Sequence, residues 1–161
     1  MTEQRPIAVF DIDGVLADVR HRLHHVESKP KHWDMFFEAA VHDEPLTEGL
    51  ALAAQLSADH EIVYLTGRPE RTRTDTAHWL KEHGLPVGKL LMRREGDRRP
   101  ARLVKVAVAR QLADKGRLAI VVDDDPDVVA ALREAGLPVR HADWMARADS
   151  LHEAQEKDGR T

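Results

Sequence analysis

The sequence predicts a single α/β domain built around a mostly parallel sheet, and three observations lead to this prediction. Short apolar runs rich in β-branched residues alternate along the chain with stretches of helical spacing. The links between them are short, as they are in βαβ units. Three of the apolar runs end directly in polar residues, which is typical of an open sheet that carries a site at its carboxyl edge.

Each expected strand is an apolar run, and each expected helix has apolar residues three and four positions apart. We expect strands at residues 7–10, 61–65, 89–92, 118–122 and 138–141, and helices at 45–56, 70–83, 103–115, 127–135 and 144–155. Pro45 should open its helix, because proline is favoured in the first helical turn. Gly84 and Gly116 mark the ends of two others. The last residues should fray.

The segment at residues 19–44 breaks this alternation, because it contains no clear core strand and one expected helix, at about 31–40. We therefore expect a small helical cap inserted into the single domain at 1–161. Three aromatic residues lie at helical spacing in it, where they either pack the inside of the cap or stack on a base: Trp33, Phe36 and Phe37. Three histidines either lie on the surface or ligate a metal: His21, His24 and His25.

Composition narrows the class of protein. The chain has 161 residues, enough for one core, and no cysteine, which excludes a disulfide framework and a cysteine zinc site. Its formal net charge is −4, so a nucleic acid would have to bind at a local basic patch. The N-terminus lacks the pattern of a signal peptide, and no apolar run is as long as a membrane span. We therefore expect a cytoplasmic protein that does not bind membranes.

Two carboxylates follow the first strand. Asp11 and Asp13 are two residues apart, so they can face the same site, and Gly14 allows a sharp turn after them. Carboxylates this close repel each other unless a cation or a proton lies between them. A hard divalent cation, most simply Mg²⁺, fits such oxygen ligands. The alternative is a strand end with two solvated aspartates.

Three further chemical groups follow the later strands. The second strand runs into Thr66 and Gly67, the fourth runs into Asp123 and Asp124, and Lys105 lies early in the helix between them. Because the carboxyl ends of parallel strands share one edge of a sheet, these groups should converge with the first two carboxylates. Acids, a hydroxyl, an anion-binding turn and an amine suit phosphoryl transfer through an aspartyl phosphate.

The motif order DxDGV, T-G-R, lysine and D-D resembles the haloacid dehalogenase-like (HAD) superfamily of phosphohydrolases over nearly the whole chain. The resemblance implies a Rossmann-like three-layer sandwich with strand order 5-4-1-2-3 and Mg²⁺-dependent hydrolysis of a phosphomonoester. It assigns the nucleophile to Asp11, the general acid and base to Asp13, and phosphoryl binding to Thr66 and Lys105. It also implies four metal ligands: Asp11, the backbone carbonyl of Asp13, Asp123 and Asp124.

Three stretches, starting at residues 66, 90 and 119, are more closely similar to the 3′-phosphatase domain of phage-type polynucleotide kinase/phosphatase. That likeness implies that Arg68 and Arg22 bind substrate, at the 3′-phosphate end of a nucleic acid. The chain departs from the family at Ala101, where an aspartate is usual four residues before the lysine. No G-x-x-x-x-G-K-[ST] motif occurs, so we expect no kinase half, and protein partners stay unknown.

The link at residues 93–102 carries five arginines against two acids. They either grip the phosphates of a nucleic acid or simply lie in a solvated loop: Arg93, Arg94, Arg98, Arg99 and Arg102. Two other functions stay open beside a polynucleotide 3′-phosphatase. One is a 5′(3′)-nucleotidase for small nucleotides, because DIDGVLAD also resembles deoxyribonucleotidases. The other is a non-catalytic binding protein on the same frame, although every catalytic position is filled.

Overall fold

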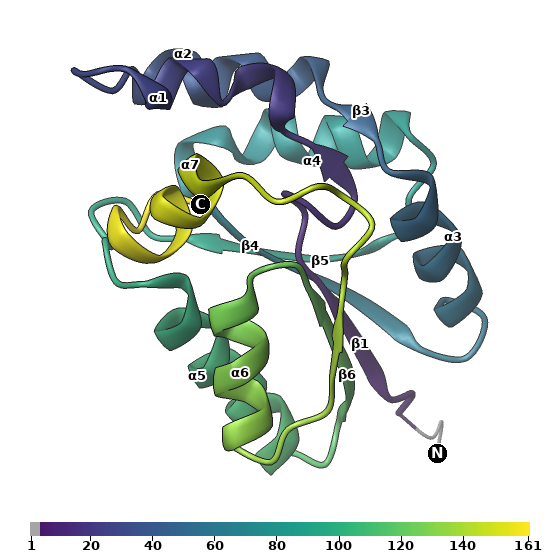
Figure 1. Ribbon diagram of the computed structural model, residues 1–161. Coiled ribbons are helices and arrows are strands. Elements are labelled where there is room, and N and C mark those ends of the chain that lie inside the picture. Colours follow the sequence, from purple (N-terminus) through teal and green to yellow (C-terminus); the bar gives the residue numbers. More distant parts are fainter. Residues whose placement is uncertain (1–3) are drawn as a thin grey trace.

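The computed structural model describes residues 4–161 and is built on a central sheet of five strands (Figure 1). Across the sheet the order is β5, β4, β1, β6 and β7, with bounds Gly88–Arg93, Glu61–Pro69, Ile7–Phe10, Leu118–Asp123 and Val139–His141. Every neighbouring pair is parallel. Numbered along the chain, the strands stand in the order 3-2-1-4-5, which is the predicted order read from the other edge. The predicted fold is therefore confirmed; the first three residues of the expected 1–161 domain lie outside the described residues.

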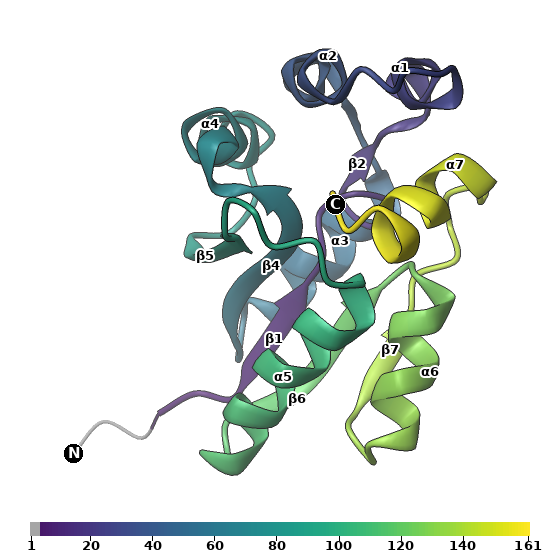
Figure 2. The same ribbon diagram turned by 90° about the vertical axis from the view of Figure 1, so that its left-hand side faces the viewer.

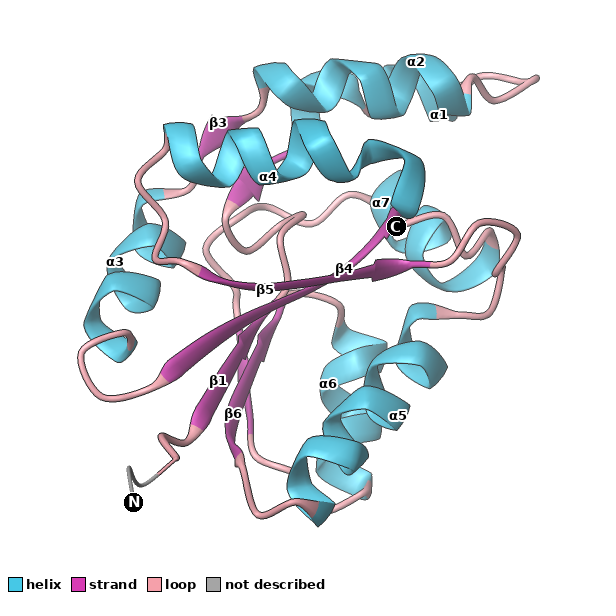
Figure 3. Cartoon of the chain, turned by 180° about the vertical axis from the view of Figure 1, so that it is seen from behind, coloured by secondary structure: helices cyan, strands magenta, loops and turns pink. Residues whose placement is uncertain are grey.

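Helices cover both faces of the sheet, because alternate residues of a strand point to opposite sides. Ala8 and Phe10 of β1 pack in one apolar cluster, and Ile7 and Val9 pack in another on the opposite face. The first cluster includes α3 and α4 and the second α5 and α6, with bounds Thr47–Leu56, Arg73–Glu82, Ala101–Asp114 and Pro126–Glu134. Figure 3 shows the two pairs of helices on either side of the strands. None of the helices within residues 4–161 is long and apolar enough to cross a membrane.

The segment at residues 19–44, called the cap segment below, consists of short helical turns. These are η1, α1, α2 and η2, at Arg20–Arg22, His24–Glu27, Trp33–Glu38 and Ala39–His42. At its base β2 and β3 pair antiparallel, at Ala17–Asp18 and Glu44–Pro45. Figure 1 shows α1 and α2 above the central strands. Phe36 and Phe37 are buried in an apolar cluster with Leu151, which confirms packing as the role of these two rings.

The helix expected to open at Pro45 begins two residues later. Pro45 pairs with Ala17 in the small antiparallel sheet, and α3 starts at Thr47. Proline suits an edge strand as well as a first helical turn, because neither needs its missing N–H. The pairing with Ala17 places Pro45 in the edge strand and not in the helix, so the prediction for Pro45 was wrong.

The chain after β7 also differs from its prediction. In place of a helix at residues 144–155, α7 spans Asp149–His152 and a π-helical turn, η4, follows at Glu153–Lys157. The chain before α7 is irregular. There the indole N–H of Trp144 donates to the backbone carbonyl of Val15, beyond the end of β1, at 2.8 Å. The expectation that the last residues fray was wrong as well, because Thr161 is only 3% exposed.

Candidate active site

The site lies where β1, β4 and β6 end, and Asp11 is at its centre. Phe10, the last residue of β1, pairs with Tyr64 of β4 and Val122 of β6. Asp11 extends this ladder by donating its N–H to the carbonyl of Val122 at 3.0 Å. The next residue of β6 is Asp123, so the parallel register brings the two carboxylates to the same level of the sheet.

Lys105 lies between these two carboxylates. Its Nζ is 2.6 Å from Oδ2 of Asp123 and 3.1 Å from Oδ2 of Asp11. Lys105 is on the second turn of α5, where its side chain is buried against the sheet edge. Burial alone would lower the pKa of Lys105, but Asp11 and Asp123 outweigh this effect and raise it. The ammonium group therefore stays charged, as a site for an anionic oxygen requires.

The turn after β1 brings Gly14 against Asp124. Gly14 has φ +84°, and a Cβ placed on it would overlap the carboxylate of Asp124. Only glycine combines this backbone conformation with so close an approach. The turn thus brings Asp124, which is far along the chain, next to the end of β1.

Three buried carboxylates form a set that could hold a metal ion. Asp11, Asp123 and Asp124 each offer an oxygen, and these oxygens lie within 4.8 Å of one another. Burial raises the pKa of Asp11 despite Lys105, and Asp123 and Asp124 raise it further. Burial, followed by repulsion from Asp123, raises the pKa of Asp124 to about 7. A divalent cation would relieve this excess of negative charge, and an all-oxygen set suits a hard ion such as Mg²⁺.

Asp124 has two further neighbours from the C-terminal part of the chain. Arg147 Nη1 forms an ion pair with its Oδ2, and Gln155 Nε2 lies 3.5 Å from its Oδ1. Neither residue belongs to a motif in the sequence, and neither was predicted. Both lie in the irregular and π-helical stretch that replaces the expected terminal helix.

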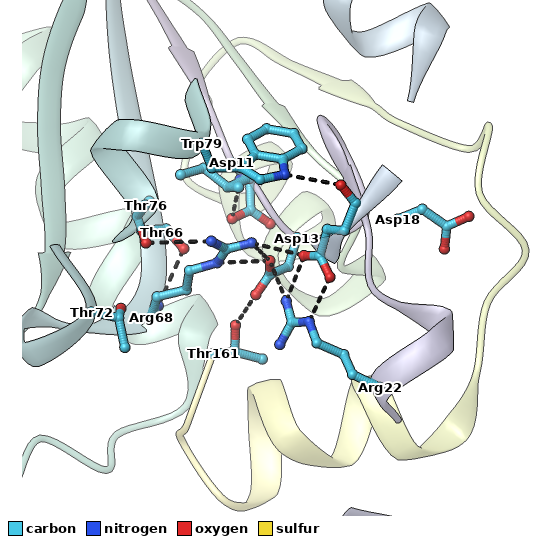
Figure 4. A network of polar contacts seen from close by, with 12 residues as sticks. Asp11, Asp13, Asp18, Arg22, Thr66, Arg68, Thr72, Thr76, Trp79 and Thr161 are labelled. Atoms are coloured by element: carbon cyan, nitrogen blue, oxygen red, sulfur yellow. Dashed lines mark hydrogen bonds and ion pairs between the residues drawn. The ribbon is translucent and has the colours of Figure 1, made fainter. Parts of the chain in front are cut away.

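Asp13 is held by two arginines, as Figure 4 shows. Arg68 donates to Oδ1 of Asp13 from Nε at 2.9 Å and from Nη2 at 2.7 Å, and Arg22 donates to the same oxygen at 3.0 Å. Burial alone would raise the pKa of Asp13, but Arg68 and Arg22 outweigh it and hold that pKa below its usual value. Asp13 is therefore ionised in this arrangement.

Asp43 joins the two arginines and was missed in the sequence. It accepts from Arg22 Nε at 2.8 Å and Nη2 at 3.0 Å, and from Arg68 Nη2 at 3.1 Å. His21 Nε2 lies 2.6 Å from it, and Trp79 donates its indole N–H to its backbone carbonyl. A single aspartate before a two-residue strand has no sequence pattern that could have revealed it.

The T-G-R turn completes the site. The hydroxyl oxygen of Thr66 accepts from the N–H of Arg68 at 3.2 Å. A Cβ on Gly67 would overlap the backbone of Thr161, which reaches the site from the end of the chain. The hydroxyl of Thr161 donates to Oδ2 of Asp13, and Figure 4 shows it pointing at that carboxylate. No pattern in the sequence indicated this contact.

The arginines of the link at residues 93–102 do not all face solvent. Arg93 is 2% exposed and donates to the carbonyls of Gly67 at 3.0 Å and Arg99 at 2.7 Å. Neither alternative, a grip on phosphates or a solvated position, holds for Arg93, because its guanidinium group is used inside the protein. Arg99 is bonded to Asp97 at 2.8 Å.

Arg102 is bonded to a different carboxylate, that of Glu156, at 2.7 Å. Ala101, at the start of α5, is buried in the apolar cluster beneath the sheet. Of the three cap histidines, only His21 contacts the site, through Asp43. The rings of His24 and His25 lie against each other at a tilt of 40°, with centroids 4.0 Å apart. The structure brings together eight of the candidate residues: Asp11, Asp13, Arg22, Thr66, Arg68, Lys105, Asp123 and Asp124.

Comparison with protein families gives one match, to a model described as "Polynucleotide kinase PNKP phosphatase domain", over residues 5–144. A search of curated proteins found no match. Among solved structures, two chains from Pnkp1/Rnl/Hen1 complexes, one named an RNA repair complex, are similar with TM-scores of 0.67 and 0.66 and identities of 21% and 22%. They cover 88% and 87% of this chain but only 47% and 44% of their own length.

Two further structures match over most of both chains. A hydrolase of the haloacid dehalogenase-like family from Streptococcus pneumoniae, SP0104, has a TM-score of 0.61 at 15% identity and covers 94% of this chain and 91% of its own. The putative HAD-hydrolase YfnB from Bacillus subtilis, bound to magnesium, has a TM-score of 0.56 at 11% identity, with 85% and 88% covered. At such identities these likenesses concern the fold.

Proposed function

Since this chain belongs to the family of PNKP phosphatase domains, we propose that it removes the 3′-phosphate from the end of a polynucleotide strand with the help of Mg²⁺. Membership makes it a phosphoric monoester hydrolase of the haloacid dehalogenase-like fold. The observation that carries the finer proposal is the contact of Lys105 with both Asp11 and Asp123, beside the arginine-bound Asp13.

In the proposed first step, a carboxylate oxygen of Asp11 attacks the phosphorus atom and the bond to the 3′-oxygen breaks. Asp13 gives a proton to the departing oxygen, so the products are a 3′-hydroxyl and a phosphoryl group bound to Asp11. Lys105 meets the negative charge on the phosphoryl oxygens, and the hydroxyl of Thr66 and the N–H of Gly67 provide further donors.

In the second step, water attacks the same phosphorus atom. Asp13, now ionised, accepts a proton from that water, and the bond between phosphorus and Asp11 breaks. Inorganic phosphate leaves, and both carboxyl groups return to their starting states. The overall reaction is hydrolysis of the phosphate ester, and it consumes no reactant besides water.

Asp13 can act as an acid only if it carries a proton when the phosphate ester is bound. The pKa of Asp13 is low here because burial is outweighed by Arg68 and Arg22. A phosphate dianion competes for the same guanidinium groups and draws them from the carboxylate. The pKa of Asp13 would then rise, because burial alone favours its neutral form. We therefore propose that Arg68 and Arg22 bind the substrate phosphate and thereby prepare Asp13 as the acid.

The metal in this proposal is held by the carboxylates of Asp11, Asp123 and Asp124 and by the backbone carbonyl of Asp13. These carboxylates fit a divalent cation because they are buried, close together and in excess of the positive charge around them. When bound, Mg²⁺ would supply positive charge to the phosphoryl oxygens.

A polynucleotide is the proposed substrate class because the matching family model is that of a polynucleotide enzyme. Arg99 and Arg102 are proposed to bind phosphates next to the reacting end, by exchanging Asp97 and Glu156 for phosphate oxygens. The chain spans about half the length of the two Pnkp1-complex chains.

A substrate panel tests the proposal. Oligonucleotides with 3′-phosphate or 2′,3′-cyclic phosphate ends, mononucleotides and an aryl phosphate are compared in Mg²⁺ and in EDTA, with Asp11→Asn as the inactive control. We expect a 3′-phosphorylated oligonucleotide to give the highest kcat/KM, and EDTA to abolish turnover. Arg99→Ala with Arg102→Ala should lower the rate on the oligonucleotide more than the rate on the aryl phosphate.

Two results would contradict the substrate assignment. If a mononucleotide is hydrolysed at least as well as the oligonucleotide, the protein is a nucleotidase. If no phosphate ester is hydrolysed with Mg²⁺, or if Asp11→Asn retains full activity, the proposed catalytic role of these residues is wrong. The hypothesis of a non-catalytic binding protein is then favoured.

A further inference from the structure

The candidate active site is closed in this structure. The exposed fraction is 3% for Asp11, 2% for Asp13, 2% for Thr66 and 3% for Lys105. A phosphate group at the end of a nucleic-acid strand cannot reach Asp11 without a movement of the protein. Some of the residues that cover Asp11 and Asp13 therefore have to move when substrate binds.

Thr161 is one of the residues that cover them. Its hydroxyl donates to Asp13, and its backbone lies so close to Gly67 that a Cβ there would overlap it. Arg93 Nη2 lies 3.5 Å from its carbonyl oxygen. Thr161 thus lies between the proposed general acid and the anion-binding turn, where a phosphate ester would have to be.

Residues 153–161, called the terminal segment below, are tied to the cap segment. Lys31 Nζ lies 2.6 Å from Oδ2 of Asp158 and 3.0 Å from Oε1 of Glu153. The guanidinium group of Arg160 stands 5.0 Å from the ring centre of Trp33. Figure 2 shows the C-terminus and α7 below α1 and α2 and above α5.

The terminal segment is also tied to the α/β core. Glu156 accepts from Arg102 at 2.7 Å, and a Cβ on Gly159 would overlap the backbone of Arg98. Within the segment, the N–H of Asp158 donates to Glu153 and that of Arg160 to Ala154, both at 2.9 Å. The segment therefore connects the cap segment to the core directly over the site.

We propose that residues 158–161 fill the route by which the phosphorylated end reaches Asp11, and that substrate enters by displacing them. This inference rests on the proposed function. The hydroxyl of Thr161 takes the place of the leaving oxygen, because it donates to Asp13 where that oxygen would receive its proton. The carbonyl of Thr161 takes the place of a phosphoryl oxygen beside Gly67.

The charges of the terminal segment favour a polyanion as the displacing ligand. Its acids pair with two cations: Glu156 with Arg102, and Glu153 and Asp158 with Lys31. A strand with several phosphates can take over both cations at once, whereas a small phosphate ester can replace only Thr161. The segment thus disfavours small esters and is opened by a nucleic-acid end.

A charge exchange between Lys31 and Asp158 tests the proposal, because neither residue is placed in the catalytic machinery. Lys31→Glu removes the ion pairs with both Asp158 and Glu153, and Asp158→Lys removes the shorter of the two. The double variant re-forms the pair between positions 31 and 158 with opposite signs. Each single variant should raise kcat/KM on an aryl phosphate by about three- to tenfold, the gain expected when a minor open state becomes populated. The double variant should return toward wild type. Lys115→Glu, at the exposed end of α5, is the control for the change in charge.

Hydrogen exchange at the amides of Asp158 and Arg160 gives a readout that does not depend on turnover. Exchange should become faster in the single variants. It should also become faster in the Asp11→Asn protein when a short 3′-phosphorylated oligonucleotide and Mg²⁺ are added. If all proteins, wild type included, hydrolyse no phosphate ester, the proposed function and this inference both fail. If wild type is active but the single variants match it, or if the oligonucleotide leaves the exchange unchanged, only this inference is overturned.

Discussion

Gly14 and Asp124 approach so closely that no side chain fits between the turn after β1 and the end of β6. The backbone of Gly14, at φ +84°, also favours glycine. Two requirements, one of conformation and one of space, therefore coincide at a residue next to the proposed metal ligands.

Gly14→Ala should abolish Mg²⁺-dependent hydrolysis, because the added Cβ displaces the Asp124 carboxylate. Gly84→Ala is the matched control: Gly84 has φ +72° but nothing within 4 Å of an added Cβ. Both changes should lower the free energy of unfolding by about 1–2 kcal/mol because of the backbone conformation, and chemical unfolding would measure this loss. Only Gly14→Ala should lose the Mg²⁺-induced rise in thermal midpoint, and an equal rise in both variants would show that the approach does not matter for the metal.

Asp11→Asn should remove activity while stabilising the metal-free protein. Burial raises the pKa of Asp11, so its ionised form is unfavourable at neutral pH, and an amide relieves that cost. The thermal midpoint in EDTA should rise by about 2–4 °C, as expected for a gain near 1 kcal/mol. A lower midpoint in EDTA would mean that the ion pair with Lys105 outweighs the burial of the carboxylate.

Asp43→Ala should be strongly destabilising, by about 3–5 kcal/mol, because it leaves Arg22 and Arg68 buried with less negative charge. Asp43→Asn keeps an acceptor and should fold, with a higher KM for phosphate esters because the two guanidinium groups lose their fixed positions. Asp75→Asn, on the exposed side of α4, is the control. An unchanged KM in Asp43→Asn would show that Asp43 acts on stability alone.

Asp97 should titrate well below an ordinary aspartate. Hydrogen bonds from Arg99 lower the pKa of Asp97 to about 2, against a smaller opposing effect of burial. Since the folded value lies below the unfolded one, the contribution to stability is present above about pH 4 and is lost as the pH falls through about 2. A carboxyl NMR titration measures this value directly, and Arg99→Gln should move it back toward 3.8. A midpoint near 3.8 in wild type would leave Arg99 free for phosphate.

The sequence by itself predicted a mostly parallel α/β sheet, and the resemblance to the haloacid dehalogenase-like superfamily supplied the strand order. Asp11, Asp13 and Asp123 could be found because each follows an apolar run, and because parallel strands end at one edge. Such signals are local: a few neighbouring residues define a strand, and a general rule of topology brings the strand ends together.

Only the tertiary structure revealed the roles of Asp43, Arg93 and Thr161. In the sequence, nothing distinguishes Arg93 from the four other arginines of its link. In the structure, its guanidinium group donates to the carbonyl of Gly67. Thr161 reaches Asp13 across 148 positions of the chain. Contacts of this kind have no period and no fixed spacing, because they depend on how separate elements pack, so the sequence around each residue does not encode them in a form that can be read without the fold.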